Sequence, residues 1–329
     1  MTLQYNAPAP EPMGNLEYGL YADFDVLLRK FDNDGNVVSE HMPVKGCPNL
    51  ITDNGMNLFG MGPINNGSAT GYFSSRCQVG TGTGTLSFSD TALFNRRAAA
   101  GSGGIGNRIA YWDTTNPKTL VLQFVYQFAV GAATGALTEL GLSSDDTGSL
   151  STHAFFKDAF GDPTVVDVDS DEQVIVTYRL YITPSELDDV FVVTQNDVEY
   201  TITTRLGRAG SWTDGAVYER FSGLLSYSGA TSSYYYTGAS SGVGPVTSIP
   251  SGDVSGFQNF SAVYGAYTAG NFYRDDSCTI SLNQAIANNI GAFRFDAVPF
   301  TVQIGISPRL NKTSNDTIKF TVRTSWTRL

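Results

Sequence analysis

Residues 174–182 read Val-Ile-Val-Thr-Tyr-Arg-Leu-Tyr-Ile, and this stretch decides the fold class. Every second side chain from Val174 to Ile182 is large and apolar, while Thr177 and Arg179 stand between them. A period of two places the apolar side chains on one face of a β-strand, whereas an amphipathic helix needs a period near 3.6. The segment therefore predicts a half-buried strand, as in antiparallel sheets with one face on the core.

The same alternation recurs in three other segments, residues 122–130, 300–307 and 318–327. Turn-forming residues between Ser307 and Asp316 join the last two segments, which predicts a C-terminal hairpin. Alternation at Phe24, Val26 and Leu28 precedes the turn sequence of residues 32–36, which predicts an N-terminal hairpin.

The composition agrees with a β-rich chain, since 35 of 329 residues are glycine and only 16% are charged. We expect an all-β fold of mainly antiparallel, sandwich-like sheets, with a few short helices and long loops. The candidate helices are short and lie at residues 49–59, 90–94 and 281–290. Residues 223–256, rich in Tyr, Ser and Gly, are expected to form surface loops.

Three units are predicted along the chain. Residues 1–14, which include the Pro-rich stretch 7–12, are expected to form an extended arm that docks on a neighbour or a disordered terminus. Residues 15–184 form a first β-rich domain, and residues 185–329 form a second, with long loops and the C-terminal hairpin. The boundary is placed at Thr183-Pro184.

The net charge of −11 is concentrated in one region. Residues 139–199 hold 14 acidic side chains and two basic ones, whereas the chain from Arg309 onward holds five basic groups and one acidic group. Because such an acidic protein repels phosphate backbones, we expect no nucleic-acid partner. The asymmetry favours contact between the basic end, through Arg323 and Arg328, and an acidic face of another copy; a solvated acidic surface is the alternative.

The compartment is indicated by the cysteines and by the absence of long apolar runs. Cys47, Cys77 and Cys278 are odd in number and widely spaced, which favours reduced thiols in a protein folded in a cytoplasm. No apolar run approaches 18 residues, and Met1 to Gly14 lacks basic residues. We therefore expect neither membrane insertion nor a secretory signal.

Two glycine motifs lack the context that their chemistry needs. Residues 101–106 match the dinucleotide pattern G-x-G-x-x-G, but a β-like segment rather than a helix follows them. Residues 238–242 match the nucleophile pattern G-x-S-x-G, but both histidines, His41 and His153, precede Ser240, so the Ser-acid-His order is missing. We expect no cofactor and no catalytic residues.

Carboxylates offer the remaining candidate chemistry. Asp167, Asp169 and Asp171 alternate and would share one side of an extended segment, where they could hold a cation, but exposed strand residues are the expected reading. Residues 32–35 resemble half of a calcium loop and are expected to form a turn. We expect no metal, although a glycosidase with two flanking carboxylates stays open.

Tyrosines supply the candidate contact residues. Tyr234, Tyr235 and Tyr236 lie in the expected loops, and Tyr218 lies just before them. Their rings could stack on sugars or, as is more common, form protein interfaces.

Several ordered blocks resemble the tail-fibre and other tail- or neck-associated virion proteins of tailed bacteriophages. The blocks span roughly residues 49–182 and are 49–55, 77–83, 90–93, 137–142, 155–158 and 174–180. The ending, Ile306-Ser307-Pro308 and then residues 316–326, is similar to how such chains finish. Residues 190–298 carry no resemblance.

The resemblance implies a non-enzymatic structural component of a phage virion, placed in the tail, neck or collar, baseplate or fibres. Its partners would be further copies of itself and other virion proteins, and it would fold in the host bacterial cytoplasm. The alternative is a receptor-binding adhesin whose tyrosine loops hold a host surface glycan.

Overall fold

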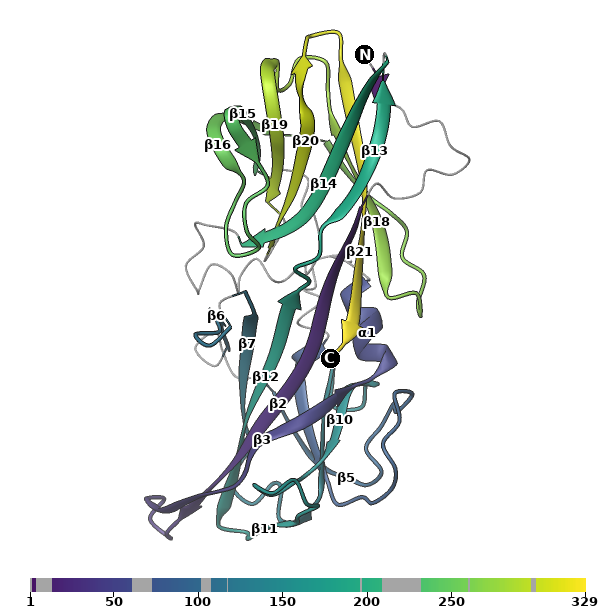
Figure 1. Cartoon of the computed structure of the whole chain (residues 1–329). Helices are drawn as coiled ribbons and strands as arrows, with labels where there is room; N and C mark the ends of the chain where they lie inside the picture. Colours follow the sequence, from purple (N-terminus) through teal and green to yellow (C-terminus); the bar gives the residue numbers. More distant parts are fainter. Residues whose placement is uncertain are drawn as a thin grey trace.

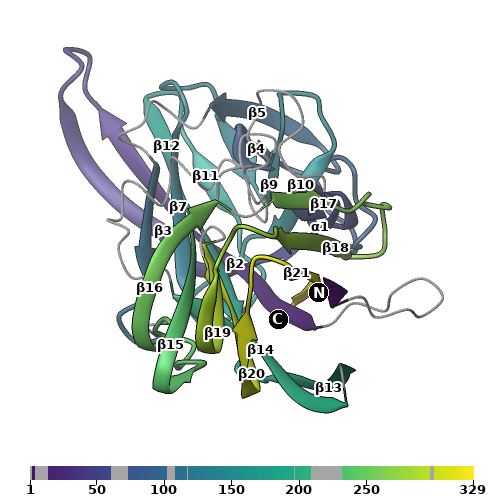
Figure 2. The same ribbon diagram turned by 90° about the horizontal axis from the view of Figure 1, so that it is seen from above.

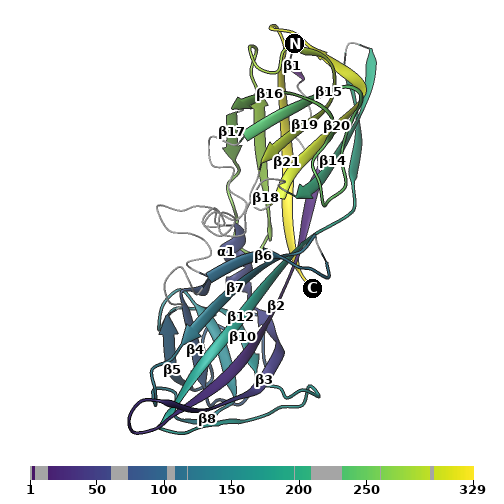
Figure 3. The ribbon, with the colours of Figure 1, turned by 90° about the vertical axis from the view of Figure 1, so that its left-hand side faces the viewer.

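The computed structural model describes residues 2–3, 14–60, 73–101, 108–116, 118–195, 197–208, 232–259, 261–296 and 300–329. Strands make up 62% of the structure, so the expected mainly antiparallel β fold is confirmed. Figure 1 shows an elongated molecule with two lobes. The N-terminal lobe contains β3 to β12, the C-terminal lobe contains β13 to β20, and β2 and β21 run between them (Figures 1 and 3).

The larger sheet has 13 strands. Its main path runs through β17 (Ser261–Tyr264), β18 (Tyr273–Ile280), β21 (Thr317–Arg328), β2 (Asn15–Phe31), β3 (Val37–Ile51), β10 (Leu150–Phe155), β9 (Glu139–Ser143), β4 (Arg76–Gly80) and β5 (Arg96–Gly101). Off this path, the remaining pairings are β1 (Thr2–Leu3) on β21, β12 (Glu172–Pro184) on β2, β7 (Leu120–Gln127) on β12 and β6 (Arg108–Trp112) on β7.

The second sheet has six strands and belongs to the C-terminal lobe. In order, they are β13 (Asp189–Gln195), β14 (Val198–Arg208), β20 (Phe300–Lys312), β19 (Ala287–Asp296), β15 (Ser232–Gly242) and β16 (Ser251–Asn259). A two-stranded sheet joins β8 (Gly135–Leu137) to β11 (Val166–Val168). The described strand pairs are antiparallel except those that β21 makes with β1 and β2.

The predicted alternation places the core as expected. Val176, Tyr178 and Leu180 of β12 are buried, whereas Thr177 and Arg179 between them lie on the other face and are half-buried. Phe24, which lies opposite Tyr178 on the neighbouring strand β2, packs on Phe156 with ring centroids 5.8 Å apart. Each fully buried side chain of this size contributes about 1.5–3 kcal/mol to folding.

The predicted N-terminal hairpin is confirmed. β2 pairs with β3 up to Phe31 and Val37, and Asp32 closes the turn by accepting hydrogen bonds from the backbone of Asp34 and Asn36. The calcium-like sequence is therefore a turn. The tip of this hairpin projects from the body of the molecule (Figure 2).

The predicted C-terminal hairpin is wrong. Asp316 does close a turn after β20, because it accepts hydrogen bonds from the backbone and hydroxyl of Thr313, both at 2.7 Å. However, β20 pairs with β14 and β19, while β21 pairs with β1, β2 and β18. The chain crosses from one sheet to the other, where the ring of Phe320 in β21 contacts those of Phe293 and Phe295 in β19 at tilted and edge-on angles.

Helix α1 (Asp53–Gly60) overlaps the expected helical segment 49–59 and ends one residue beyond it. Thr52 caps it by accepting a hydrogen bond from the backbone of Gly55. A side chain at position 55 would put a Cβ 2.1 Å from the carbonyl oxygen of Ser151, so only glycine lets α1 pack on β10. The other two expected helices are wrong: residues 90–94 form an irregular loop, and residues 281–290 form turns and the start of β19.

The predicted boundary at Thr183-Pro184 coincides with the end of β12. Hydrogen bonding nevertheless continues across it, because β2 pairs with β21 from Asn15 to Leu20. Of the predicted arm, residues 2–3 form β1 and residue 14 is described, whereas the Pro-rich stretch lies outside the described residues. The division into two domains stays a prediction.

The end of β21 joins the lobes. Arg328 donates a hydrogen bond to the carbonyl oxygen of Ile51 at 2.7 Å and forms an ion pair with Asp53 at 2.5 Å. Its guanidinium also lies 4.2 Å from the centre of the Phe88 ring. Trp326, fully buried, donates its indole N–H to the carbonyl oxygen of Met56 in α1.

We therefore expect Arg328→Ala to lower the free energy of unfolding by about 1–2 kcal/mol, because it removes charge-assisted hydrogen bonds at the junction. Urea unfolding measures this loss. The matched control is Lys319→Ala, at an exposed position of the same strand, for which we expect less than about 0.5 kcal/mol. Equal losses in the two variants would contradict the junction role of Arg328.

Candidate functional site

The predicted tyrosine site is only partly a surface feature. Tyr218 lies outside the described residues. Tyr234, Tyr235 and Tyr236 lie in strand β15, not in a loop, so that expectation is wrong. Tyr236 is 1% exposed and accepts a hydrogen bond from Arg294, whose guanidinium lies 4.1 Å from the centre of the Tyr234 ring.

The strand forms there because β15 pairs with β16 and β19 through irregular registers, which accommodate its small residues. A buried Tyr236 cannot contact a partner. Tyr234 and Tyr235 are half-buried, and their part in an interface stays a prediction.

The two predicted basic contact residues are engaged within the chain. Arg323 forms a two-bonded ion pair with Asp275 at 2.7 and 2.9 Å, and it lies 3.9 Å from the centre of the Tyr273 ring. Arg328 holds the junction described above. Both residues therefore stabilise the fold, and any contact with another copy stays a prediction.

The alternating aspartates do not converge on one point. Asp169 and Asp171 both pair with Lys30, at 3.1 and 3.4 Å, while Asp167 lies exposed in β11. Within the described ranges, no group of three or more His, Cys, Asp or Glu side chains is placed to hold a metal ion.

Neither glycine motif lies in the structural context that its chemistry requires, as far as the described residues show. Of residues 101–106, only Gly101 is described, at the end of β5. Residues 238–242 lie within β15, so Ser240 stands in a strand and not at the strand-to-helix turn of a nucleophile elbow.

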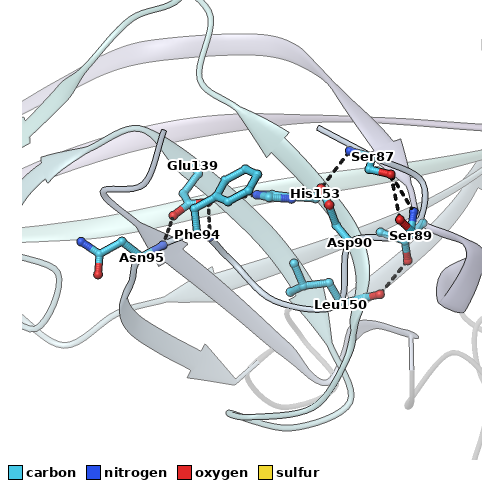
Figure 4. Close-up of polar contacts among 9 residues, drawn as sticks. Ser87, Ser89, Asp90, Phe94, Asn95, Glu139, Leu150 and His153 are labelled. Carbon is cyan, nitrogen blue, oxygen red and sulfur yellow. Dashed lines mark hydrogen bonds and ion pairs between the residues drawn. The ribbon is translucent and has the colours of Figure 1, made fainter. Parts of the chain in front are cut away.

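A buried network of hydrogen-bonded side chains lies in the N-terminal lobe (Figure 4). His153 lies in β10, Glu139 begins β9, and Asp90 comes from the loop between β4 and β5. Nδ1 of His153 lies 2.7 Å from Asp90, and Nε2 lies 3.0 Å from Glu139. The side chains of His153 and Glu139 are fully buried, and that of Asp90 is 14% exposed.

Backbone groups complete the site around Glu139. Its carboxylate accepts hydrogen bonds from the backbone N–H groups of Gly82, Phe94 and Asn95, at 2.8–3.0 Å. A Cβ at Gly82 would lie 2.4 Å from the same carboxylate, so glycine is needed for this approach. The network thus fixes the loop of residues 81–95 onto β9 and β10.

The charge of Glu139 follows from these contacts. Burial raises the pKa of its carboxyl group, but hydrogen bonds from His153, Asn95, Phe94 and Gly82 outweigh burial and hold the pKa below its usual range. The carboxylate form is therefore the stable one at neutral pH.

The geometry limits the chemistry that His153 can perform. A catalytic histidine needs one ring nitrogen free to exchange a proton with substrate or nucleophile. Here each ring nitrogen faces a carboxylate oxygen, and the stacked rings of Phe94 and Phe155 lie beside the imidazole. The arrangement is suited to cross-linking three segments of the chain.

A second polar cluster lies on the outer face of the same lobe. Arg179 of β12 binds Asp23 through Nε and Asp25 through both Nη atoms, at 2.7–2.9 Å. Tyr181 donates to Asp23, and its ring stacks on that of Tyr21 with centroids 4.1 Å apart.

Burial raises the pKa of Asp23 despite its contacts with Arg179. For Asp25, burial is outweighed by hydrogen bonds from Arg179 and Gly46, so its pKa lies below the usual value. Both clusters escaped the sequence analysis. The available signal was a charged residue inside an apolar run, as at Glu139 between Leu137 and Leu140.

Comparison with known proteins identifies no similar protein. No protein-family model matches the chain, and neither the curated proteins nor the solved structures searched contain a match. The described part of the chain contains no helix with the length and hydropathy that a membrane span requires.

We expect Glu139→Gln to lower the free energy of unfolding by about 3 kcal/mol at pH 7, because it leaves the buried His153 without one of its charged partners. Since the folded-state pKa of Glu139 lies below its ordinary value of 4.5, the carboxylate stabilises the fold above that pH and this stabilisation is lost as pH falls through the folded-state pKa. The difference in free energy of unfolding between the wild type and Glu139→Gln should therefore become smaller below about pH 4.5.

Urea unfolding at several pH values between 7 and 3 measures this difference. The control is Glu40→Gln, which breaks an exposed pair with Arg29 and should cost less than about 1 kcal/mol. If the difference in free energy of unfolding between the wild type and Glu139→Gln stays constant down to pH 3, the charge of Glu139 is not what stabilises the site.

Proposed function

We propose that this chain is a non-enzymatic structural component of a tailed-phage virion, located in the tail, neck or collar, baseplate or fibres. It acts as a homo-oligomer that contacts other virion proteins. It folds in the bacterial cytoplasm, which agrees with three buried, unpaired cysteines.

The observation that carries this proposal is where the resembling blocks meet. Residues 77–83 supply Gly82, residues 90–93 supply Asp90, and residues 137–142 supply Glu139. Residues 49–55 reach the same strand pair, because Asn49 donates to Thr152, the neighbour of His153. Blocks that are far apart in sequence thus build one buried cross-link, as expected when a resemblance reflects a shared scaffold and not shared chemistry.

The surface also supports a role in assembly. Phe160 and Leu187 are 91% and 80% exposed, and valines protrude from several strands. Val190 and Val192 protrude together from one face of β13, and protein interfaces bury exposed apolar rows of this kind.

The adhesin alternative keeps one specific observation in its favour. Tyr21, 38% exposed, stacks on Tyr181 beside Asp23 and Arg179, which places aromatic faces next to fixed polar groups. Sugars bind surfaces of this composition through ring stacking and hydrogen bonds.

The experiment is the molar mass of the purified chain by light scattering at near-physiological salt. We expect a discrete closed oligomer, a whole multiple of 35.3 kDa. A monomer of 35.3 kDa would contradict the homo-oligomer, and a monomer that also binds glycan through the Tyr21 face would favour the adhesin.

A further inference from the structure

Sheet edges are where one β protein can pair with another, and most edges of this chain carry features that prevent it. Native edges are blocked by short length, positive charge, proline or bulges. Among the described edge strands, β6 and β17 are short, with five and four residues. Positive charge or proline marks two others, as β5 has Arg96 and Arg97 and β3 has Pro43 and Lys45. The register of β16 is shifted near Gly252.

β13 lacks every one of these features. Its seven residues, Asp-Val-Phe-Val-Val-Thr-Gln, contain no proline, glycine, lysine or arginine, and its register with β14 is unbroken. Among the described residues β14 is its only strand partner, and Figure 2 places it at the outer border of the molecule. Val190 and Val192 are 54% and 53% exposed, while Phe191 and Val193 pack against the core.

We propose that β13 pairs antiparallel with β13 of a second copy, about a two-fold axis at Val192, so that the six-stranded sheet continues into its neighbour. In this register Val192 faces Val192, Val190 faces Thr194, and Phe191 faces Val193. Aromatic and β-branched residues opposite one another are the pairs that stabilise antiparallel strands. A two-fold contact of this kind is self-complementary, as isologous interfaces require.

The charges near β13 permit this register. Asp189 faces position 195, an uncharged glutamine, so no like charges within the strand lie directly opposite. Asp188, just before the strand, is already neutralised by Arg205, which binds both its oxygens at 2.5 Å. Of the other carboxylates near the strand ends, Glu186 pairs with Lys118 at 3.0 Å, and Glu199 lies on β14, one strand away from the proposed contact. Asp197, in the turn between β13 and β14, faces the uncharged Leu187 in this register.

This inference rests on the proposed homo-oligomer and narrows it. Pairing through β13 makes the number of copies even, which fits paired copies around a neck or collar and excludes a threefold fibre.

The test is a register-specific disulfide. Directly opposed residues have Cα atoms about 4.5–5.5 Å apart, within the range of a disulfide. We expect Val192→Cys to form an intermolecular disulfide under mild oxidation with oxidised glutathione. Val190→Cys is the matched control, because its two copies would lie about 14 Å apart along the strands. The native cysteines are buried and do not compete.

Non-reducing electrophoresis should show at least about fivefold more cross-linked dimer for Val192→Cys than for Val190→Cys. Equal cross-linking of both variants, or of neither, overturns the β13 pairing. If cross-linking fails but light scattering shows that the wild type is an oligomer, the proposed function stands and only the β13 pairing fails. A wild-type trimer has the same meaning. A wild-type monomer overturns both the proposed homo-oligomer and the β13 pairing.

A second variant tests the β13 pairing independently, in case the cysteine variants do not fold. Val192→Lys adds an edge lysine at an exposed position and should halve the molar mass, whereas Val254→Lys on β16, 58% exposed, should leave it unchanged. Unchanged mass for Val192→Lys contradicts the pairing.

Discussion

Strand β2 is the constraint on which both lobes depend. One edge pairs with β12 from Tyr18 to Lys30, while the other pairs first with β21 and then with β3. The partner of β2 changes from β21 to β3 at the point where β21 ends. There the backbone N–H of Leu329 donates to the carbonyl oxygen of Leu20, and Arg328 donates to the carbonyl oxygen of Ile51. Removing β2 would leave long edges of β12, β3 and β21 unpaired, and unpaired buried backbone groups are costly.

The buried network of His153, Glu139 and Asp90 resembles this shared strand, since it joins separate segments of the chain. His153, Glu139 and Asp90 hold an irregular loop against the sheet at fixed distances, and Arg179 does the same for β2 and β12 on the outer face. Buried polar groups whose hydrogen bonds are satisfied in this way fix one arrangement of the chain. A scaffold of this kind, with the apolar edge strand β13, agrees with the role in an assembly that we propose.

The sequence predicted what side-chain periodicity controls. Residues 174–182 and 318–327 form strands with the expected faces, because alternation alone decides which side chains are buried. It could not predict which edges pair, so residues 300–327 were expected to form a hairpin although β20 and β21 belong to different sheets.

At residues 234–236 the composition led to a wrong prediction, because the Ser, Thr, Gly and Ala residues that flank the three tyrosines in this irregular strand are typical of a loop. The network could not be foreseen either, because Asp90 and His153 are 63 residues apart and meet only through tertiary structure.

Differential scanning calorimetry tests the shared strand most directly. If β2 couples the two lobes, the chain should unfold in one transition whose calorimetric enthalpy equals its van't Hoff enthalpy. Two separate transitions, with one lobe folded while the other is unfolded, would contradict the account.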